Sequence, residues 1–318
     1  MENIAIIGAG GYGMALGECL SLTGTNHISF ISRNEKIVNS INHSHTNDQY
    51  FPGRKLNPRL RANCSFEPIK DCSAIFLAVP SHAIEECLEG CIPHLNAETL
   101  VINLAKGMSI DGGLIYDQLE AQRKAALKGP TFATEMFNGL PSSLTFGSEN
   151  STDVELIDMI FHDSKITLDY THDVRGVEYL SVLKNVYAIA LGIVAGTYNS
   201  PNVDFIILTK AVKEMRAYLE HAGCDPNTIF NYCGIGDLGL TALNDLSRNR
   251  TLGLLIGKGF LGDNPGNSVV VEGLRAVQIF SQNAEEWAAG DEFPVLLSLN
   301  AFLKGETTLS DFISSSVG

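Results

Sequence analysis

One lysine stands alone in a long apolar stretch of the chain. Between Glu178 and Asp204 the only charged residue is Lys184, and Asn185 lies beside it. Aliphatic residues surround this lysine at spacings that cover nearly every face of a helix, and a helix that is apolar on all sides is a buried helix. Burying an unpaired ammonium group is costly, so such a lysine is usually paired, deprotonated or functional. The pattern predicts a buried functional lysine, with a structural lysine that extends to the surface as the alternative.

A second cluster further along the chain supplies acidic and basic groups. Asp237 lies in the glycine-rich stretch Gly234-Ile235-Gly236-Asp237-Leu238, within an apolar context, and is therefore a credible partner for Lys184. Thr241 follows, and Ser247-Arg248-Asn249 then begins a helical pattern. Three polar side chains together with the free N–H groups of a helix N-terminus form an anion site. Each piece alone could be an ordinary helix cap or a surface ion pair, but together with the lysine they predict a functional site.

A glycine-rich loop follows the first apolar run of the chain. Residues 3–7 have β character, the loop Gly8-Ala9-Gly10-Gly11-Tyr12-Gly13 comes next, and a helical pattern follows. A strand, a G-x-G-x-x-G loop and a helix in this order are the fingerprint of dinucleotide binding. We expect Gly8 to make the tight turn, Gly10 to let the pyrophosphate approach the backbone, and Gly13 to allow close packing of helix and strand. The loop predicts NAD or NADP as the cofactor.

Arg33 bears on the choice between these two cofactors. It follows the expected second strand, 27–31, where an NAD enzyme usually carries an acidic residue for the ribose hydroxyls. An arginine at this position suits the 2′-phosphate of NADP, and the alternative is a solvated surface arginine. The position favours NADPH.

A scaffold must position these groups, and the pattern of the first half of the chain predicts a buried parallel sheet. Short apolar runs with β character alternate with helical patterns, which is typical of doubly wound α/β domains. Lys106 directly follows one of these strands, and ligands bind at the carboxyl ends of strands in such sheets. The expected strands are 3–7, 27–31, 74–79, 100–104, 125–127, 142–146 and 166–170.

Three expectations concern the segments between these strands. We expect a polar loop over 43–61 and a helix over 111–124. A capping box from Thr152 to Glu155 predicts the start of a further helix.

After residue 170 the strand signals stop and the remaining patterns are helical. They cover the Lys184 helix, 205–222, 247–258, 270–282, 294–303 and a short terminal segment. The predicted architecture is α/β, with a doubly wound Rossmann-type domain that binds NAD(P) over 1–171. An all-α domain that carries the predicted functional lysine follows over 172–318, and it is the expected substrate-binding domain.

The composition argues against several classes of function. The 318 residues carry a formal charge of −14, which disfavours nucleic acids and anionic membranes as partners. Lys184, Asn185 and Gly192 interrupt the long apolar run before it could span a membrane. The N-terminus lacks the basic flank and the apolar length of a signal peptide, so we expect a cytoplasmic protein. The seven cysteines form no C-x-x-C pair, which indicates reduced packing thiols, and no metal site is expected.

The chain resembles the bacterial-type NAD(P)-dependent glycerol-3-phosphate dehydrogenases from end to end. Several of the shared motifs are more selective than the glycine loop. They are the loop 8–13, Asn47-Asp48-Gln49-Tyr50-Phe51-Pro52-Gly53, Val79-Pro80-Ser81, Ala105-Lys106-Gly107, Gly129-Pro130-Thr131-Phe132-Ala133, the run 176–193, the cluster 234–238, Ser247-Arg248-Asn249 and Val270-Val271-Glu272-Gly273.

The resemblance implies a reaction and a set of site residues. The reaction is reversible hydride transfer between NAD(P)H and dihydroxyacetone phosphate, giving sn-glycerol 3-phosphate, a precursor of glycerophospholipids. The implied catalytic residues are Lys184, Asp237, Lys106 and Thr241. The implied substrate contacts are Lys106, Gly129, Thr131, Lys184, Asn185, Asp237, Ser247, Arg248 and Asn249. The implied cofactor contacts are Gly8, Gly10, Gly11, Tyr12, Gly13, Arg33, Lys106, Ala133, Arg248, Val270 and Glu272. The partner is a small phosphate ester, and the assembly is expected to be a homodimer.

The chain departs from the family at three places, of which only the end of the second strand bears on the cofactor, and two alternative functions remain. The second strand ends Ile31-Ser32-Arg33, without the family's usual tryptophan, so the preference for NADPH rests on Arg33 itself. The first alternative is another two-domain dehydrogenase of the 6-phosphogluconate dehydrogenase-like group, such as a ketopantoate enzyme, acting on a different hydroxy or keto compound. It is distinguished by the anion site, which suits a small phosphate ester. The second is a non-catalytic NAD(P)H sensor, which would not need the two lysines and the aspartate to converge.

Overall fold

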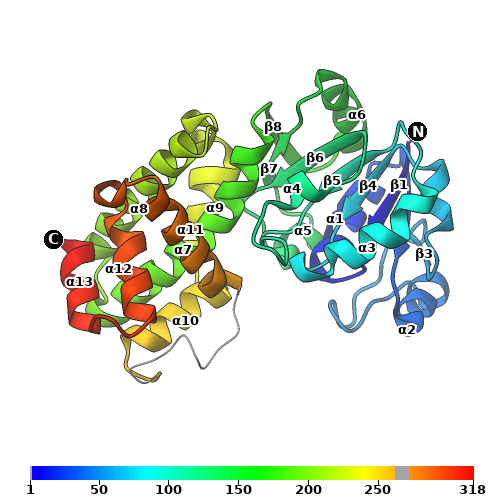
Figure 1. Ribbon diagram of the computed structural model, residues 1–318. Coiled ribbons are helices and arrows are strands. Elements are labelled where there is room, and N and C mark those ends of the chain that lie inside the picture. Colours follow the sequence, from blue (N-terminus) through cyan, green and yellow to red (C-terminus); the bar gives the residue numbers. More distant parts are fainter. Residues whose placement is uncertain (1, 262–271) are drawn as a thin grey trace. The chain divides into compact units, whose positions relative to one another are not determined.

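The computed structural model describes residues 2–261 and 272–318, and it divides into two compact units (Figure 1). The first unit spans Met1–Val174 and is built around a sheet, and the second spans Arg175–Gly318 and is helical. In the described residues after Thr171 no strand occurs. An α/β sheet unit followed by a helical unit is the predicted fold class, which is confirmed.

Eight strands of the first unit form one sheet in the order β3-β2-β1-β4-β5-β6-β7-β8. All neighbours are parallel except β6 and β7, so the last two strands run against the other six. Strand order reverses at β1, where the chain crosses from β3 at the edge back to β4, and ligands bind at such switch points. The strands are β1 Glu2–Ile7, β2 Asn26–Ile31, β3 Arg61–Asn63, β4 Ala74–Leu77, β5 Leu100–Asn103, β6 Arg123–Lys128, β7 Ser142–Gly147 and β8 Ile166–Thr171.

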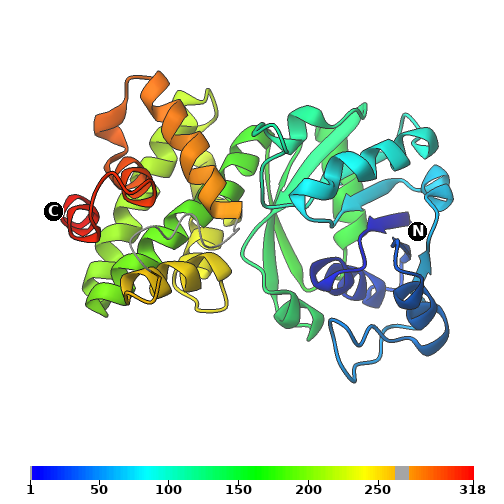
Figure 2. The same cartoon turned by 60° about the horizontal axis from the view of Figure 1, so that its bottom comes forward.

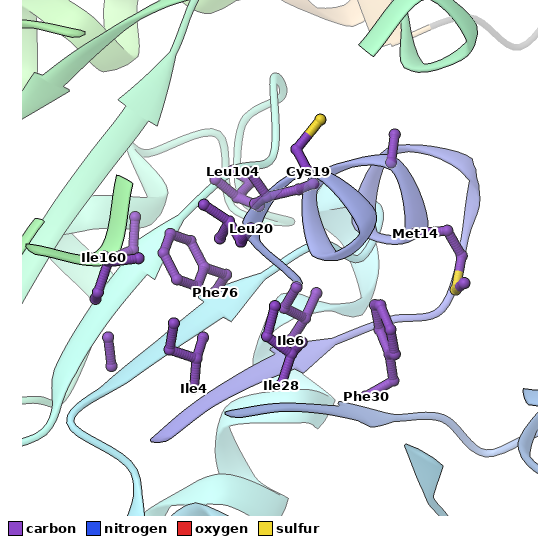
Figure 3. Close-up of a cluster of buried hydrophobic side chains, with 14 of the residues drawn as sticks. Ile4, Ile6, Met14, Cys19, Leu20, Ile28, Phe30, Phe76, Leu104 and Ile160 are labelled. Atoms are coloured by element: carbon purple, nitrogen blue, oxygen red, sulfur yellow. The ribbon is translucent and has the colours of Figure 1, made fainter. Parts of the chain in front are cut away.

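Helices cover both faces of this sheet because alternate strand residues point to opposite sides. Ile4 and Ile6 of β1 belong to the apolar cluster on the side of α1, α5 and α6, as Figure 3 shows for part of that cluster. Ala5 and Ile7 belong to the cluster on the side of α3 and α4. The helices of this unit are α1 Gly11–Leu22, α2 Glu35–Asn39, α3 Ile84–Cys91, α4 Ile115–Gln118, α5 Ala133–Phe137 and α6 Ser151–Phe161.

The helical unit is organised around α7. Every residue from Leu180 to Ala195 is buried, and α7 lies between α10 and α11 in both views (Figures 1 and 2). In the part of the chain that the structure describes, α7 alone has the length and composition to cross a membrane, but 83% of its most apolar window is buried inside the protein. The helices are α7 Val174–Tyr198, α8 Pro201–His221, α9 Asp237–Ala242, α10 Arg248–Gly257, α11 Glu272–Glu286, α12 Pro294–Leu303 and α13 Leu309–Val317.

Glycines allow α7 and α10 to touch along their backbones. A Cβ atom added to Gly192 would lie 2.3 Å from the carbonyl oxygen of Arg250, and one added to Gly253 would lie 2.2 Å from that of Ile189. One turn further along, Gly196 and Gly257 meet in the same way. Since any side chain at these positions would meet backbone, the four glycines fix how closely and in which register the two helices pack.

Some of the expected elements differ from the structure. Of the expected helix over 111–124, only Ile115–Gln118 is helical, because Ser109 donates to Asp111 and to the carbonyl of Gly113 and so forms a turn around the glycine pair. The sixth helix is capped by Asn150, whose Oδ1 accepts from the amide of Thr152 at 3.0 Å, so the expected capping box is wrong. Helix α2 and strand β3 were not predicted, and β3 falls at the end of the expected polar loop over 43–61.

Candidate functional site

The glycine loop between β1 and α1 has the shape that a dinucleotide needs. Gly8 has a φ of +107°, and a Cβ there would lie 2.6 Å from the carbonyl oxygen of Ala78. A Cβ on Gly13 would lie 2.2 Å from the carbonyl oxygen of Gly8, so helix and loop touch there. Beside Gly10, by contrast, nothing lies within 4 Å of an added Cβ. The turn, the open position and the close contact occur where the sequence predicted them, and the open position leaves room for a pyrophosphate.

A cavity of about 330 Å³ adjoins this loop. It is lined from the carboxyl ends of β1, β2 and β4, with Phe66 and Cys87 among its walls. Its position at the switch point of the sheet and its largely apolar wall fit the adenosine half of a nicotinamide cofactor. The residues present therefore fit NAD or NADP.

Arg33 lines the same cavity and is paired with a carboxylate. Its Nη1 lies 2.6 Å from Oε1 of Glu86 on α3, and both side chains are largely exposed. An exposed ion pair contributes little free energy, so the guanidinium can exchange this partner for a phosphate. The pairing was not predicted, and it places a negative charge beside the position where a 2′-phosphate would bind.

The other expected cofactor residues of this unit lie near the same loop or at the next strands. An added Cβ on Gly11 would contact the ring of Tyr50 at 3.7 Å and the Cβ of Ala133 at 4.0 Å, so these two expected contacts, Gly11 and Ala133, are neighbours. Tyr12 packs against the core beneath α1. Val270 lies outside the described residues, and of Glu272, the first residue of α11, only the backbone is described.

The carboxyl ends of β5 and β6 bring Lys106 and Gly129 together. Lys106 Nζ donates to the carbonyl oxygen of Gly129 at 2.8 Å, and Thr131 Oγ1 lies 3.5 Å from the same oxygen. The three expected substrate contacts of the sheet unit therefore occupy one place. Beneath them lies Lys128, a fully buried lysine for which the sequence indicated no role.

In the helical unit Lys184 is buried and paired. Its Nζ lies 2.5 Å from Oδ1 of Asp237 and 3.1 Å from Oγ1 of Thr241, and the lysine and aspartate are 4% and 1% exposed. Asp237 and Thr241 are four residues apart on α9, so they lie on the same face of that helix. Asn185, also buried, donates to the carbonyl of Ser181 at 3.4 Å. The predicted pairing of Lys184 with Asp237 agrees with this geometry.

The predicted anion cluster opens α10. Ser247 is the N-cap, and its Oγ accepts from the amide of Arg250 at 3.4 Å. Arg248 is exposed, as a side chain that meets a soluble anion must be. The Oδ1 atom of Asn249 is buried and has no hydrogen-bond partner among the described residues, so it can accept from a substrate hydroxyl, whereas the Nδ2 of the same amide is the atom that can donate to a phosphate.

Arg250 belongs to the polar run that begins at Ser247, and the sequence indicated no separate role for it. It is buried, its Nε donates to Asp245 at 3.0 Å, and its Nη1 donates to the carbonyl of Ala242 at the end of α9. It thereby ties the helix that carries Asp237 to the one that carries Arg248. Its place in a run of polar residues gave no signal that its side chain would be buried.

Comparison with known proteins bears on both units. A family model described as the NAD-dependent glycerol-3-phosphate dehydrogenase N-terminus matches residues 3–154, and the model of the C-terminus of the same family matches residues 173–314. A glycerol-3-phosphate dehydrogenase (NAD(P)+) of Psychrobacter cryohalolentis is 30% identical over 309 residues, which cover 95% of this chain and 71% of that protein.

Solved structures give the same picture. The crystal structure of a glycerol-3-phosphate dehydrogenase from Coxiella burnetii matches with a TM-score of 0.85 and 26% identity, covering 98% of each chain. A ketopantoate reductase from Ralstonia eutropha matches with a TM-score of 0.60 and 14% identity, covering 96% of this chain and all of that one, a likeness of fold alone.

Proposed function

This chain belongs to the NAD-dependent glycerol-3-phosphate dehydrogenase family, and from that premise we propose how its own residues carry out the reaction. The reaction is the reversible NAD(P)H-dependent reduction of dihydroxyacetone phosphate to sn-glycerol 3-phosphate. We assign catalysis to Lys184, Asp237 and Thr241 in the helical unit and to Lys106 in the sheet unit, where Lys106 is also a proposed contact of the substrate.

The contact between Lys184 and Asp237 is the observation that carries this assignment. A buried ion pair is weak evidence for stability, because desolvation of the two charges offsets their attraction. A lysine and an aspartate almost without exposure, joined at 2.5 Å in the most apolar helix of the chain, are therefore better explained by chemistry.

The proposed role of Lys184 is to serve the oxygen of the substrate carbonyl. The nicotinamide cofactor supplies the hydride when it is bound. As the carbonyl carbon is reduced, negative charge develops on its oxygen, and the Lys184 ammonium stabilises that charge and then donates the proton that completes the alcohol. Asp237 holds the ammonium in place and favours its charged form, and Thr241 contacts both groups at 3.1 and 3.4 Å. In the reverse direction the neutral lysine accepts the proton.

The phosphate of the substrate is assigned to the start of α10. The N–H groups of a helix N-terminus and an exposed arginine both favour an anion. Ser247, Arg248 and Asn249 are the proposed contacts there, and Asn185 is proposed as a contact next to Lys184. Gly129 and Thr131 are proposed as further contacts from the sheet unit.

Both cofactors suit the residues of the sheet unit, and we propose NADPH as the preferred one because Arg33 lines the adenosine cavity. Gly8, Gly10, Gly11, Tyr12, Gly13 and Ala133 are the other proposed contacts there, together with Lys106. We further propose that the protein is a cytoplasmic homodimer and that its product supplies glycerophospholipid synthesis. Light scattering of the purified protein tests whether it is a dimer.

The alternative is a related two-domain dehydrogenase, since a ketopantoate reductase shares the fold. The positively charged start of α10 favours a phosphate ester over ketopantoate as the substrate. The deciding experiment mixes purified protein with NADPH or NADH and follows absorbance after adding dihydroxyacetone phosphate, dihydroxyacetone or ketopantoate. We expect turnover with the phosphate ester alone to be fast. Faster turnover with ketopantoate would refute the assignment, and binding of NADPH without turnover of any substrate would support a sensor.

A further inference from the structure

Lys128 is a second buried lysine that the proposed mechanism does not use. It is the last residue of β6 and has no exposed surface. Its Nζ donates to the carbonyl oxygen of Asn103 at 3.2 Å and to that of Ala105. Asn103 is the last residue of β5, and Ala105 directly precedes Lys106. The buried ammonium therefore bonds to the backbone that carries Lys106.

The contact is reciprocated from the other side. Lys106 Nζ donates to the carbonyl of Gly129, and Gly129 directly follows Lys128. Each lysine thus bonds to the carbonyl that adjoins the other lysine, so two side chains cross between the ends of neighbouring parallel strands. Asn103 adds a third restraint, because its Oδ1 accepts from the amide of Ala105 at 2.9 Å.

Gly129 anchors this pair of contacts to the sheet. An added Cβ would lie 2.7 Å from the carbonyl oxygen of Ser143 and 2.9 Å from the Cα of Leu144, so its backbone packs directly on β7. Lys128 itself pairs with Thr145 in the register of β6 and β7. The carbonyl that receives Lys106 therefore belongs to a rigid element, and the loop after β5 is held by groups that cannot shift independently of the sheet.

We propose that Lys128 is a positioning residue for Lys106. Its ammonium fixes the backbone of residues 103–106 and so fixes where the Lys106 side chain begins. The inference rests on the proposed function, in which Lys106 contacts the substrate. A side chain placed by packed strands is held more precisely than one placed by a loop, and a small displacement at a reacting centre lowers the rate strongly.

The kinetic test compares two lysines of the same strand. Lys128→Met keeps the volume and removes the donor. Lys124→Met is the matched control, since Lys124 Nζ also donates to a carbonyl, that of Tyr116 at 3.0 Å, near the opposite end of β6. We expect Lys128→Met to lower kcat/KM for dihydroxyacetone phosphate about ten- to hundredfold, the value of a hydrogen bond to a charged group. Lys124→Met should stay within about threefold of wild type.

A double-mutant cycle separates positioning from a general loss of structure. If Lys128 acts through Lys106, the variant with both Lys106→Met and Lys128→Met loses no more activity than Lys106→Met alone. Losses that multiply would overturn the proposal. Lys128→Gln, which retains one donor group, should recover part of the activity and provides a second variant if Lys128→Met does not fold.

Hydrogen exchange tests the contact without any substrate. In Lys128→Met the amides of residues 104–109 should exchange at least about tenfold faster than in wild type, and in Lys124→Met they should not. Unchanged exchange in Lys128→Met would overturn the proposal even if activity fell. If wild type fails to reduce dihydroxyacetone phosphate, the proposed function fails, whereas the exchange result still decides whether Lys128 holds the Lys106 loop.

Discussion

The two units hold their buried lysines with different chemical groups. In the sheet unit Lys128 donates to carbonyl oxygens of the backbone, and in the helical unit Lys184 donates to the carboxylate of Asp237. The difference follows from secondary structure. A strand that ends at the edge of a sheet leaves carbonyls for other groups, whereas an α-helix uses its own carbonyls internally except in its last turn. Arg250 fits this rule, because the carbonyl that it reaches is that of Ala242, the last residue of α9.

The comparison teaches where each unit is vulnerable. A cation held by backbone survives any single change of partner side chain, whereas a cation held by a carboxylate depends on one residue. Substitutions in the helical unit should therefore have the larger effects, and those around the cofactor cavity the smaller ones.

Removing the helical cation should have the largest effect. Lys184→Met should lower turnover by ~100- to 10,000-fold, because general acid and electrostatic assistance together lower the activation free energy by ~3–5 kcal/mol. The melting temperature should fall, because the substitution leaves the buried carboxylate of Asp237 without its cationic partner. Steady-state kinetics and thermal melting check both. Asp237→Asn should lose less. Turnover within about threefold of wild type in Lys184→Met would remove the lysine from the mechanism.

Widening the contact between α7 and α10 should have the next largest effect. In Gly253→Ala the new methyl meets the carbonyl of Ile189 at 2.2 Å and the Cα of Gly192 at 2.8 Å, and no rotamer relieves a backbone clash. We expect the free energy of unfolding to fall by about 3 kcal/mol in a denaturant titration. Gly239→Ala in α9 is the control, because nothing lies within 4 Å of its added Cβ. Equal stability of the two variants would show that the helices can separate.

The buried carboxylate Glu214 should make the stability of the helical unit depend on pH. Burial raises its pKa to about 7, although the amides of Val295 and Leu296 and the hydroxyl of Tyr187 donate to it. Because the folded pKa lies above the unfolded value, the folded state holds the extra proton between pH ~4.5 and ~7. The free energy of unfolding should therefore fall by on the order of 2–3 kcal/mol as pH rises through this window.

Glu214→Gln isolates that contribution. Unfolding titrations of both proteins at pH 5, 6, 7 and 8 give the difference in stability at each pH. The stability of wild type relative to the variant should decline as pH rises. A constant difference would mean that Glu214 keeps the same protonation state in the folded and unfolded chains.

Truncating Arg248 should act on substrate binding. Arg248→Ala should cost about ten- to hundredfold in kcat/KM for dihydroxyacetone phosphate, the value of a hydrogen bond between charged groups. Dihydroxyacetone, which lacks the phosphate, should be a poor substrate for wild type and should be affected much less by the substitution. Cofactor and substrate concentrations are both varied, so that any loss of cofactor binding is seen separately. An equal loss for the two substrates would contradict a phosphate contact.

The smallest effect is expected at the cofactor cavity. Arg33→Ala should raise KM for NADPH by about fivefold and leave KM for NADH nearly unchanged, because the arginine is exposed and already paired. Glu86→Gln should have the opposite effect on NADPH, since it releases the guanidinium and removes a negative charge. Equal KM values for both cofactors in wild type would make Arg33 an ordinary surface residue.

Much of the scaffold could be predicted because its apolar runs are continuous. The strand over 166–171 and the helix Pro294–Leu303 occur essentially where the pattern placed them. Lys184 could be found from sequence because it is the only charged residue of a long apolar stretch, and Asp237 because its surroundings are glycine and apolar residues. In each case the signal was local.

The remainder depended on contacts between distant segments. Lys128 ends a strand whose first residues, Arg123 and Lys124, are also basic, so its complete burial has no local signature. The turn around Gly112 and Gly113 replaces the start of the helix that the pattern predicted over 111–124, because helix propensity alone does not reveal the side-chain contacts that stabilise the turn. The role of Gly192 and Gly253 depends on a partner helix sixty residues away, about which a single sequence is silent.

The glycine contact between α7 and α10 has a consequence for which substrates fit. Lys184 precedes Gly192 by eight residues, and Arg248 precedes Gly253 by five. Because the backbones interlock at those glycines, neither helix can slide, and the separation between Lys184 and Arg248 is set by the number of helical turns. With these residues as the proposed proton donor and the proposed phosphate contact, we expect the helical unit to select substrates by the number of bonds between the carbonyl and the phosphate.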